Sequence, residues 1–412
     1  MMSNIRIGEL AERTRDAQTA LGLTPHTVWN HYTTALLPIV KLHEQAGLEY
    51  FDQSLLDGYI HRIEARRDGN EIGVNHYRRL RHGVERLTEM HETGKLEWSC
   101  RGRASKFILN EYYEALLESF LSEGNWHQNT CGDLTWITRR FFAWLIQDGH
   151  DDLNGVGAQE IQRFMVYCSN HLRSSSLYNM QLYMKKLCRH LHERGYLPNT
   201  FEALLSFKVC RESKMYPAAM DDEVAAVLNT IDRRMPKGKR DYAIILLAIV
   251  TGLRAIDITR LKLTDIDWQN GEIKIVQAKT GQSLALPLTK DVGEAIRDYI
   301  LNGRQETASG EIFIRHHAPF QAFKDGVAIG DIYDAYCKRA GILRHAHDGK
   351  GIHSLRRYVG KKLVTSGISI NIAAQILGDV KIESTKKYIS LDSHHLKECA
   401  LDLSGIEMAV AK

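Results

Sequence analysis

Cysteine is scarce in this sequence, and the cysteines that are present are dispersed. There are seven among 412 residues, and no two of them form a Cys-x-x-Cys pair. A disulfide framework normally uses an even number of regularly spaced cysteines, and structural zinc sites use closely paired ones. Neither arrangement is indicated, so the fold is expected to depend on hydrophobic packing.

Long apolar runs are also lacking. The longest uninterrupted run is Ala243–Val250, whereas a helix that crosses a membrane needs about 20 apolar residues. No basic and apolar signal segment precedes this run. Hydrophobic residues make up 44% of the chain and charged residues 25%, as in soluble folded proteins. We therefore expect a cytoplasmic protein without a membrane partner, and about 100–200 residues per domain predicts two to four domains.

Neither sign of charge is in large excess. Lys and Arg number 54 against 50 Asp and Glu, which gives a net charge of +4. This balance is compatible with nucleic-acid binding but requires any DNA-binding surface to be local. Basic residues beside Tyr77 and Tyr183 are candidates for such a surface, and solvated helix faces are the alternative. These candidates are Arg78, Arg79, Arg81 and Arg86 in the first group and Lys185, Lys186 and Arg189 in the second.

The first half of the chain has helical periodicity in two segments that resemble each other. Met90–Leu96 is similar to Leu191–Leu197, which starts 101 residues later, and the helix-ending Gly47 corresponds to Gly149 with an offset of 102. Repetition at a long period indicates a duplication. The alternative is that two unrelated helical hairpins both end in glycine.

Two stretches without apolar periodicity, residues 98–106 and 209–219, predict linkers. They divide the chain into a helical N-terminal domain at residues 1–100, a helical domain at 105–208 and a third domain at 216–412. The third domain mixes helices with a small sheet. Its Asn270-Gly271 dipeptide is a strong hairpin signal, and Lys279 is expected at a second tight turn, between the strands 272–278 and 283–288.

Four short motifs and one tyrosine occur in order in this third domain. They are Thr251-Gly252-Leu253-Arg254, Lys279-Thr280-Gly281, His353-Ser354-Leu355-Arg356 and Leu377-Gly378-Asp379, with Tyr388 nine residues after Asp379. This ordered set resembles the tyrosine recombinases of the phage-integrase family. That family has an arginine after a Thr-Gly turn, a hairpin lysine, His-x-Leu-Arg, a Leu-Gly-His box and a tyrosine nine residues past its histidine. The similarity runs from about Tyr216 to Leu403.

The resemblance implies a fold class. We expect a mainly α multidomain protein, with helical N-terminal and core-binding domains and an α+β catalytic domain that contains a small antiparallel sheet. Residues 106–208 are similar to the family's core-binding domain. Residues 1–100 lie outside the family's minimal pattern and are expected to be a duplicated core-binding-like domain or an arm-binding domain.

The resemblance also implies a reaction, in which DNA strands are cut and rejoined through a 3′-phosphotyrosyl intermediate without a cofactor or a metal. Tyr388 would be the nucleophile. Arg254 and Arg356 would hold the scissile phosphate, because guanidinium groups stay protonated and bind phosphate oxygens in bidentate fashion. His353 is the candidate base, and Lys279 has the family's general-acid position.

Two aspartates of the motifs leave alternatives open. Asp257, one helical turn after Arg254, is expected either to orient the pocket or to form an ordinary ion pair. Asp379 departs from the family, which has histidine or tryptophan there, and an ionised carboxylate cannot donate a hydrogen bond to a phosphate. We expect Lys381 or His353 to supply that donor and Asp379 to cap the helix that follows.

The histidines of the loop before this domain's His-x-Leu-Arg motif do not indicate a metal site. His345, His347, Asp348 and His353 lie close together in the sequence, but they lack the closed tetrahedral set that zinc requires. No metal is therefore expected.

The expected partners are double-stranded DNA recombination sites and further copies of this chain, four protomers on two sites, with or without other recombinases. A helix at 394–403 is expected to dock on a neighbouring protomer or to pack on its own domain. Integration or transposition of a mobile element is favoured, because the family's dedicated chromosome-dimer resolvases usually lack an extension like residues 1–100. The rival interpretations are a type IB topoisomerase-like enzyme and a catalytically impaired DNA-binding accessory recombinase.

Overall fold

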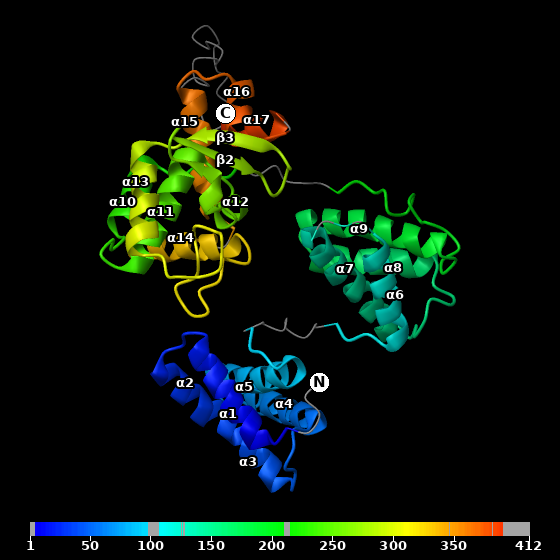
Figure 1. The fold of residues 1–412 in the computed structure, drawn as a ribbon. Coiled ribbons are helices and arrows are strands. Elements are labelled where there is room, and N and C mark those ends of the chain that lie inside the picture. The colour runs from blue at the N-terminus through cyan, green and yellow to red at the C-terminus, as the bar shows by residue number, and fades with distance from the viewer. Residues whose placement is uncertain are drawn as a thin grey trace, which may run out of the picture. The chain divides into compact units, whose positions relative to one another are not determined.

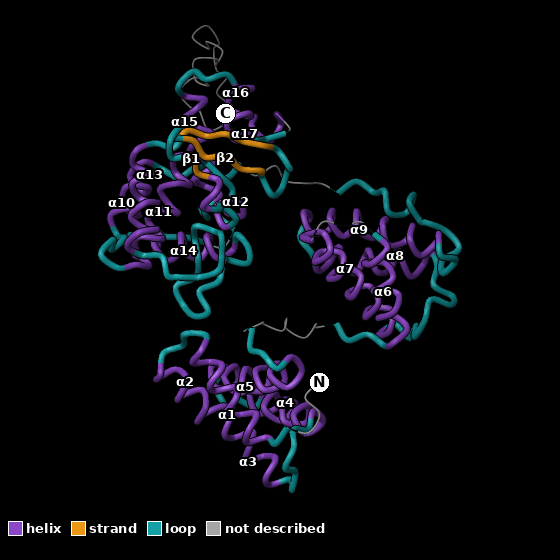
Figure 2. The backbone as a smooth tube through the Cα atoms, viewed as in Figure 1, coloured by secondary structure: helices purple, strands orange, loops and turns teal. Residues whose placement is uncertain are grey.

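The computed structural model describes residues 5–97, 107–124, 126, 128–209, 215–345, 347–380 and 382–389. The chain divides into two compact units, Arg101–Lys214 and the combination of Met1–Cys100 with Met215–Lys412. The breaks near residues 100 and 214 lie in or beside the stretches predicted as linkers. Figure 1 and Figure 2 show the elements of each part, which are described separately below.

Residues 5–97 form helices around a core of their own. Asp52 begins one of these helices, because its Oδ1 accepts the Leu55 amide at 2.7 Å and satisfies a backbone donor that the first turn leaves free. Leu10, Leu36 and Leu87 are among the buried residues of the core. The elements are α1 (Ile7–Ala20), α2 (Pro25–His31), the π-helical turn η1 (Tyr32–Leu36), α3 (Leu37–Gln45), α4 (Gln53–Asp68) and α5 (Val74–Thr93).

Residues 107–209 form four helices, α6 (Glu111–Glu123), α7 (Gln128–Gln147), α8 (Ala158–His171) and α9 (Ser174–Glu193). Their core contains stacked and tilted aromatic rings, such as Tyr113 against Phe142 with centroids 4.5 Å apart. The expected helical character of this part is confirmed. The duplication stays a prediction, although α3 and α5 end close to the positions that correspond to the ends of α7 and α9.

Residues 215–389 combine helices with one three-stranded antiparallel sheet of order β1-β2-β3. In its longer ladder, Glu272 pairs with Pro287 and Val276 with Ser283. The predicted fold class, mainly α with a small antiparallel sheet, is therefore confirmed. The elements are α10 (Asp221–Asn229), α11 (Pro236–Thr251), α12 (Ala255–Thr259), η2 (Leu263–Asp265), β1 (Ile266–Asp267), β2 (Glu272–Val276), β3 (Ser283–Pro287), α13 (Lys290–Asn302), α14 (Val327–Arg339), α15 (His353–Thr365), α16 (Ile370–Leu377) and α17 (Ile382–Ile389).

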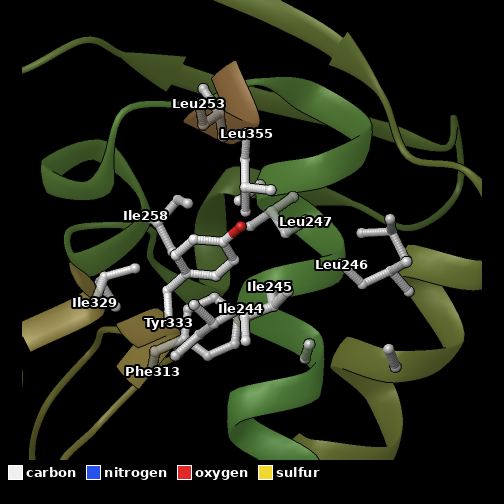
Figure 3. Packing of buried hydrophobic residues seen from close by; sticks show 14 of the residues in the cluster. Ile244, Ile245, Leu246, Leu247, Leu253, Ile258, Phe313, Ile329, Tyr333 and Leu355 are labelled. Atoms are coloured by element: carbon white, nitrogen blue, oxygen red, sulfur yellow. The ribbon is translucent and has the colours of Figure 1, made fainter. Parts of the chain in front are cut away.

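The core of this last part is organised around α11. Figure 3 shows Ile244, Ile245 and Leu247 of this helix among Tyr333 and Leu355, which come from α14 and α15. The C-terminal part of α11, from Tyr242 to Val250, is apolar nearly all round, as is typical of a buried helix, and most of its residues are buried. Burial of α11 fixes the position of its C-terminal end, where the first of the four motifs begins. Among the described residues, no helix is long and apolar enough to span a membrane.

Candidate active site

The two arginines of the motifs are placed by tight turns and by helix starts. Helix α11 ends at Gly252, whose φ of 65° lies in the left-handed region, and the chain then turns to Arg254 at the start of α12. A side chain at Gly252 would approach Leu377 to 2.8 Å, so the turn needs glycine for space as well as for backbone conformation. Arg356 lies in the first turn of α15 and is 4% exposed.

Asp379 joins these two arginines. Its Oδ1 accepts from Arg254 Nη2 at 2.8 Å and from Arg356 Nη2 at 2.7 Å. Its Oδ2 accepts from the Thr385 hydroxyl at 3.2 Å. The Asp379 side chain is only 6% exposed, so the carboxylate is an almost buried anion shared by two cations.

The arginines are also anchored on backbone and side-chain acceptors that do not belong to the motifs. Arg356 donates to the carbonyls of Gly252 at 2.8 Å and Leu377 at 2.7 Å. Arg254 donates through Nη1 to Gln277 Oε1 at 2.7 Å. Burial, followed by repulsion from Arg356, lowers the pKa of Arg254, and Asp379 opposes this effect.

Gln277 connects the turn that carries Lys279 to the arginines. It is 1% exposed; its Oε1 also accepts from the Thr280 hydroxyl at 2.8 Å, and its Nε2 donates to the Leu377 carbonyl at 3.1 Å. Gln277 is not part of the four motifs and was not predicted as a site residue. Its position at the end of a strand, two residues before the hairpin lysine, was the available signal.

Lys279 lies exposed in the turn between β2 and β3, as predicted. Asp257 holds the base of this turn, because its Oδ1 accepts the Ala278 amide at 2.8 Å. The other oxygen, Oδ2, is buried without a hydrogen-bond partner among the described residues, and burial raises the pKa of Asp257. The contact to Ala278 supports the orienting role for Asp257 more than a simple ion pair.

Tyr388 lies on α17 and is 6% exposed. Its ring packs on Gly360 of α15, where an added Cβ would come within 2.6 Å of the ring. Burial raises the pKa of Tyr388, while Arg356 and Arg357 lower it. The nucleophile candidate therefore lies near the arginine pair, with which it interacts electrostatically.

His353 is the first residue of α15, three residues before Arg356. Burial, followed by the positive charges of Arg356, Arg357, Arg254 and Lys279, lowers its pKa to about 4. The imidazole is thus neutral at pH 7 and has one nitrogen that can accept a proton and one that can donate a hydrogen bond.

The expectation that Asp379 caps the next helix is not what the structure shows. Among the described residues, its carboxylate accepts from the side chains of Arg254, Arg356 and Thr385, and none of these donors is a backbone amide. The starts of α12 and α15 lie close to the end of α16, so both guanidinium groups reach Asp379. The spacing of residues in the sequence does not reveal this proximity. Lys381 and the expected helix at 394–403 lie outside the described residues.

The basic groups proposed as DNA contacts differ in their surroundings. Arg78 and Arg79 are exposed on α5, and Arg81 pairs with Glu85 at 2.9 Å. Arg86 is 3% exposed and pairs with Glu89, so its expected place on a DNA-binding face is wrong.

The second group lies on α9, where each basic residue has a partner within its own part of the chain. Lys185 donates to Ser206 at 2.9 Å, Lys186 lies over the Trp126 ring at 4.7 Å, and Arg189 pairs with Glu202. Whether these six residues contact DNA stays a prediction. Among the described residues, no group of three or more His, Cys, Asp or Glu could hold a metal.

Comparison with known proteins assigns the family. The profile of the Phage integrase family matches residues 219–395. "Putative integrase/recombinase y4gC" of Sinorhizobium fredii is 34% identical over 192 residues, which are 46% of this chain and 96% of that protein. The chain belongs to the phage integrase family.

Other members of the phage integrase family match more of the chain. "Putative integrase/recombinase y4rA" of the same organism is 30% identical over 270 residues, 65% of each protein, so the match spans slightly less than two thirds of that relative. The tyrosine recombinase XerD of Haemophilus influenzae is 25% identical over 293 residues, 70% of this chain and 94% of that protein.

Solved structures share the fold. A lambda integrase (75–356) dimer bound to a COC′ core site matches with a TM-score of 0.54 and 17% identity, over 73% of this chain and all of that one. The recombinase XerH bound to palindromic difH matches with a TM-score of 0.55 and 15% identity, over 76% of this chain and 87% of that one.

Proposed function

We propose that this protein is a site-specific DNA recombinase that cuts and rejoins strands through a 3′-phosphotyrosyl intermediate. The observation that carries the proposal is the pocket itself. Arg254 and Arg356 each donate to the same oxygen of an anion, and Tyr388 is buried beside them. Two preorganised cations next to a hydroxyl nucleophile suit transfer of a phosphodiester.

The reaction assigns a task to each group. The Tyr388 oxygen attacks the scissile phosphorus, its proton passes to His353, and the bond to the 5′-oxygen breaks. Lys279 protonates that oxygen, which leaves as a free 5′-hydroxyl. Because a phosphodiester bond is exchanged for a phosphotyrosyl bond, a second 5′-hydroxyl can attack the intermediate and rejoin the strand without an added energy source.

Neutral His353 supports this assignment. A base must be unprotonated before it can accept the phenol proton, and a pKa of about 4 leaves this imidazole free at pH 7. Burial is the largest influence on the pKa of Tyr388 and the pKa is raised, but Arg356 and Arg357 act in the opposite direction, so these two arginines favour the phenolate that forms during attack.

We further propose that the substrates are double-stranded DNA sites and that four protomers act on two of them. Support comes from the neighbours with this fold, which include a lambda integrase tetramer bound to a Holliday junction. A role in a mobile element is supported by the integrase of the transposon Tn1549 in complex with circular intermediate DNA, at a TM-score of 0.50.

A second candidate is a DNA-binding accessory recombinase that does not cleave. Asp379 favours it, because a carboxylate stands in the pocket that would receive a phosphate. Both candidates bind DNA, so they differ only in whether the protein cleaves a strand and becomes covalently attached to it.

Covalent trapping tests the proposal. DNA fragments that bind the Tyr388→Phe variant are first selected from genomic DNA of the source organism and then rebuilt as duplexes with a nick near the site. On such a duplex the cleaved end diffuses away, so an active enzyme stays attached. We expect a protease-sensitive adduct with the unchanged protein and none with Tyr388→Phe. Binding without any adduct from the unchanged protein would establish the accessory role instead.

A further inference from the structure

Asp379 occupies the point at which hydrogen-bond donors of Arg254 and Arg356 converge. Arg356 already uses hydrogens of both Nη atoms on the carbonyls of Gly252 and Leu377, and Arg254 uses Nη1 on Gln277. The donors that converge on a common point are one Nη2 hydrogen from each arginine, and both end on Asp379 Oδ1 at 2.8 and 2.7 Å. A phosphate oxygen cannot accept these two hydrogen bonds while the carboxylate does.

Charge makes the two occupants mutually exclusive. The Asp379 side chain is 6% exposed, so water screens its charge poorly, and a second anion at the same donors would be repelled strongly. The carboxylate offsets the repulsion between the buried guanidinium group of Arg356 and the partly buried one of Arg254, which explains why it lies there.

The same carboxylate is attached to the helix that carries the nucleophile. Asp379 Oδ2 accepts from the Thr385 hydroxyl at 3.2 Å, and Thr385 is fully buried, one helical turn before Tyr388 on α17. Side chains three residues apart lie on neighbouring parts of one helix face. A movement of Asp379 away from the arginines therefore also changes a contact of α17.

We propose that Asp379 is a resident anion, which holds the phosphate-binding arginines and α17 until the phosphate displaces it. Arrival of a phosphate would then both fill the arginine pair and release Thr385, so that Tyr388 becomes free to move toward the phosphorus. This inference rests on the proposed function, because it takes the arginine pair to be the phosphate site. The contact of Asp379 with the two arginines would then be autoinhibitory, because the chain itself blocks its phosphate site.

Binding of inorganic phosphate to the full-length protein tests the displacement without any DNA cleavage. Affinity is measured by thermal unfolding across a phosphate titration at constant ionic strength, since a ligand of the folded state raises the unfolding temperature. We expect Asp379→Asn to bind phosphate at least tenfold more tightly than the unchanged protein. Asp298→Asn is the matched control, because it removes a carboxylate that pairs with Lys239 at 2.6 Å outside the pocket; it should leave the affinity unchanged.

Thr385→Val provides a second variant of nearly equal volume that keeps the carboxylate. Loss of the hydroxyl donor loosens Asp379, so phosphate affinity should rise severalfold even if Asp379→Asn fails to fold. If the variants that fold bind phosphate as tightly as the unchanged protein or more weakly, phosphate does not displace Asp379. Asp379 would then only hold the arginines in position.

Hydrogen exchange of residues 382–389 tests the release of α17. In the unchanged protein, saturating phosphate should increase exchange in this segment. In Thr385→Val, exchange should be high already and insensitive to phosphate. If phosphate leaves exchange unchanged or lowers it in the unchanged protein, the link to the nucleophile is refuted. Covalent trapping decides the proposed function separately, so either idea can fail alone.

Discussion

Gln277 allows the geometry of the site to be tested through a residue outside the motifs. Its side chain contacts Arg254, Thr280 and the Leu377 carbonyl. It thus links one phosphate-binding arginine to the turn that carries Lys279. Substitution by alanine removes all three contacts and leaves Lys279 itself intact.

The contacts set the size of the expected effect. A hydrogen bond to a charged group is worth about 2 kcal/mol and a neutral one about 1 kcal/mol, so Gln277→Ala should lower the free energy of unfolding by about 3–4 kcal/mol. Gln282→Ala is the control in the same turn. The Gln282 side chain is exposed, and such a change should stay within about 0.5 kcal/mol. Both values can be measured by urea denaturation.

Cleavage should respond to the same substitution. A displacement of about 1 Å in a group that positions the substrate can cost about 100-fold in rate, so Gln277→Ala, which frees Arg254 and the turn of Lys279, should cleave a nicked duplex about 100-fold more slowly. A duplex with sulfur in place of the bridging 5′-oxygen separates the two tasks of Gln277. A thiol is far more acidic than an alcohol and leaves without a proton donor, so this substrate does not need Lys279 in position.

We expect the sulfur substrate to restore most of the rate lost in Lys279→Ala and part of that lost in Gln277→Ala. Restoration in Lys279→Ala but none at all in Gln277→Ala would show that Gln277 does not position the turn. A Gln277→Ala protein that is as stable and cleaves as fast as the unchanged one would show that Gln277 does not hold Arg254 or the turn of Lys279.

Three further predictions follow from other parts of the chain. Gly360→Ala should displace the Tyr388 ring, because the new Cβ would lie 2.6 Å from it; covalent trapping should fall sharply while DNA binding in a gel-shift assay persists, and unchanged trapping would contradict the packing. His353 has a pKa of about 4 in the folded state against about 6.5 when unfolded, so the unfolded chain binds more protons and stability falls as the pH drops from 6.5 toward 4. Over this pH range the free energy of unfolding of His353→Gln should fall by up to about 3 kcal/mol less than that of the unchanged protein, as measured by denaturation at several pH values. An equal fall in both proteins would argue against a neutral buried imidazole. Deletion of residues 1–100 should weaken binding to a selected site, and the loss should be largest at low salt and shrink at higher salt if phosphates are contacted; an unchanged footprint and unchanged recombination would exclude a role in binding or synapsis.

The sequence predicted the parts of the site that short-range geometry determines. Gly252 and Gly378 lie in the left-handed conformation at the ends of α11 and α16, as glycines after apolar helices should. Lys279 lies in a turn because strand periodicity on both sides requires one. The spacing of Arg254, Arg356 and Tyr388 was recognisable because the motifs are local, and the structure brings the three residues into one pocket.

The parts that were missed or misjudged depend on distances between elements. The bond from Gln277 to Arg254 spans 23 residues and the bond from Asp379 to Arg254 spans 125. No periodicity within one helix or strand encodes such pairs. Asp379 was expected to cap a helix because Asp is a frequent cap after glycine, but two guanidinium groups within hydrogen-bond distance outweigh backbone amides as partners of a carboxylate. Arg86 was misjudged for a similar reason, since a basic run does not show which of its members faces Glu89.

The identity of the residue joined to DNA shows whether Tyr388 is the nucleophile. The protein is trapped on a nicked duplex that contains its selected site, digested with nuclease and protease, and analysed by mass spectrometry. We expect one adducted peptide, in which the Tyr388 oxygen carries a nucleotide through its 3′-phosphate. A nucleotide on any other residue, or one attached through its 5′-phosphate, would contradict the assignment of the nucleophile and of the reaction.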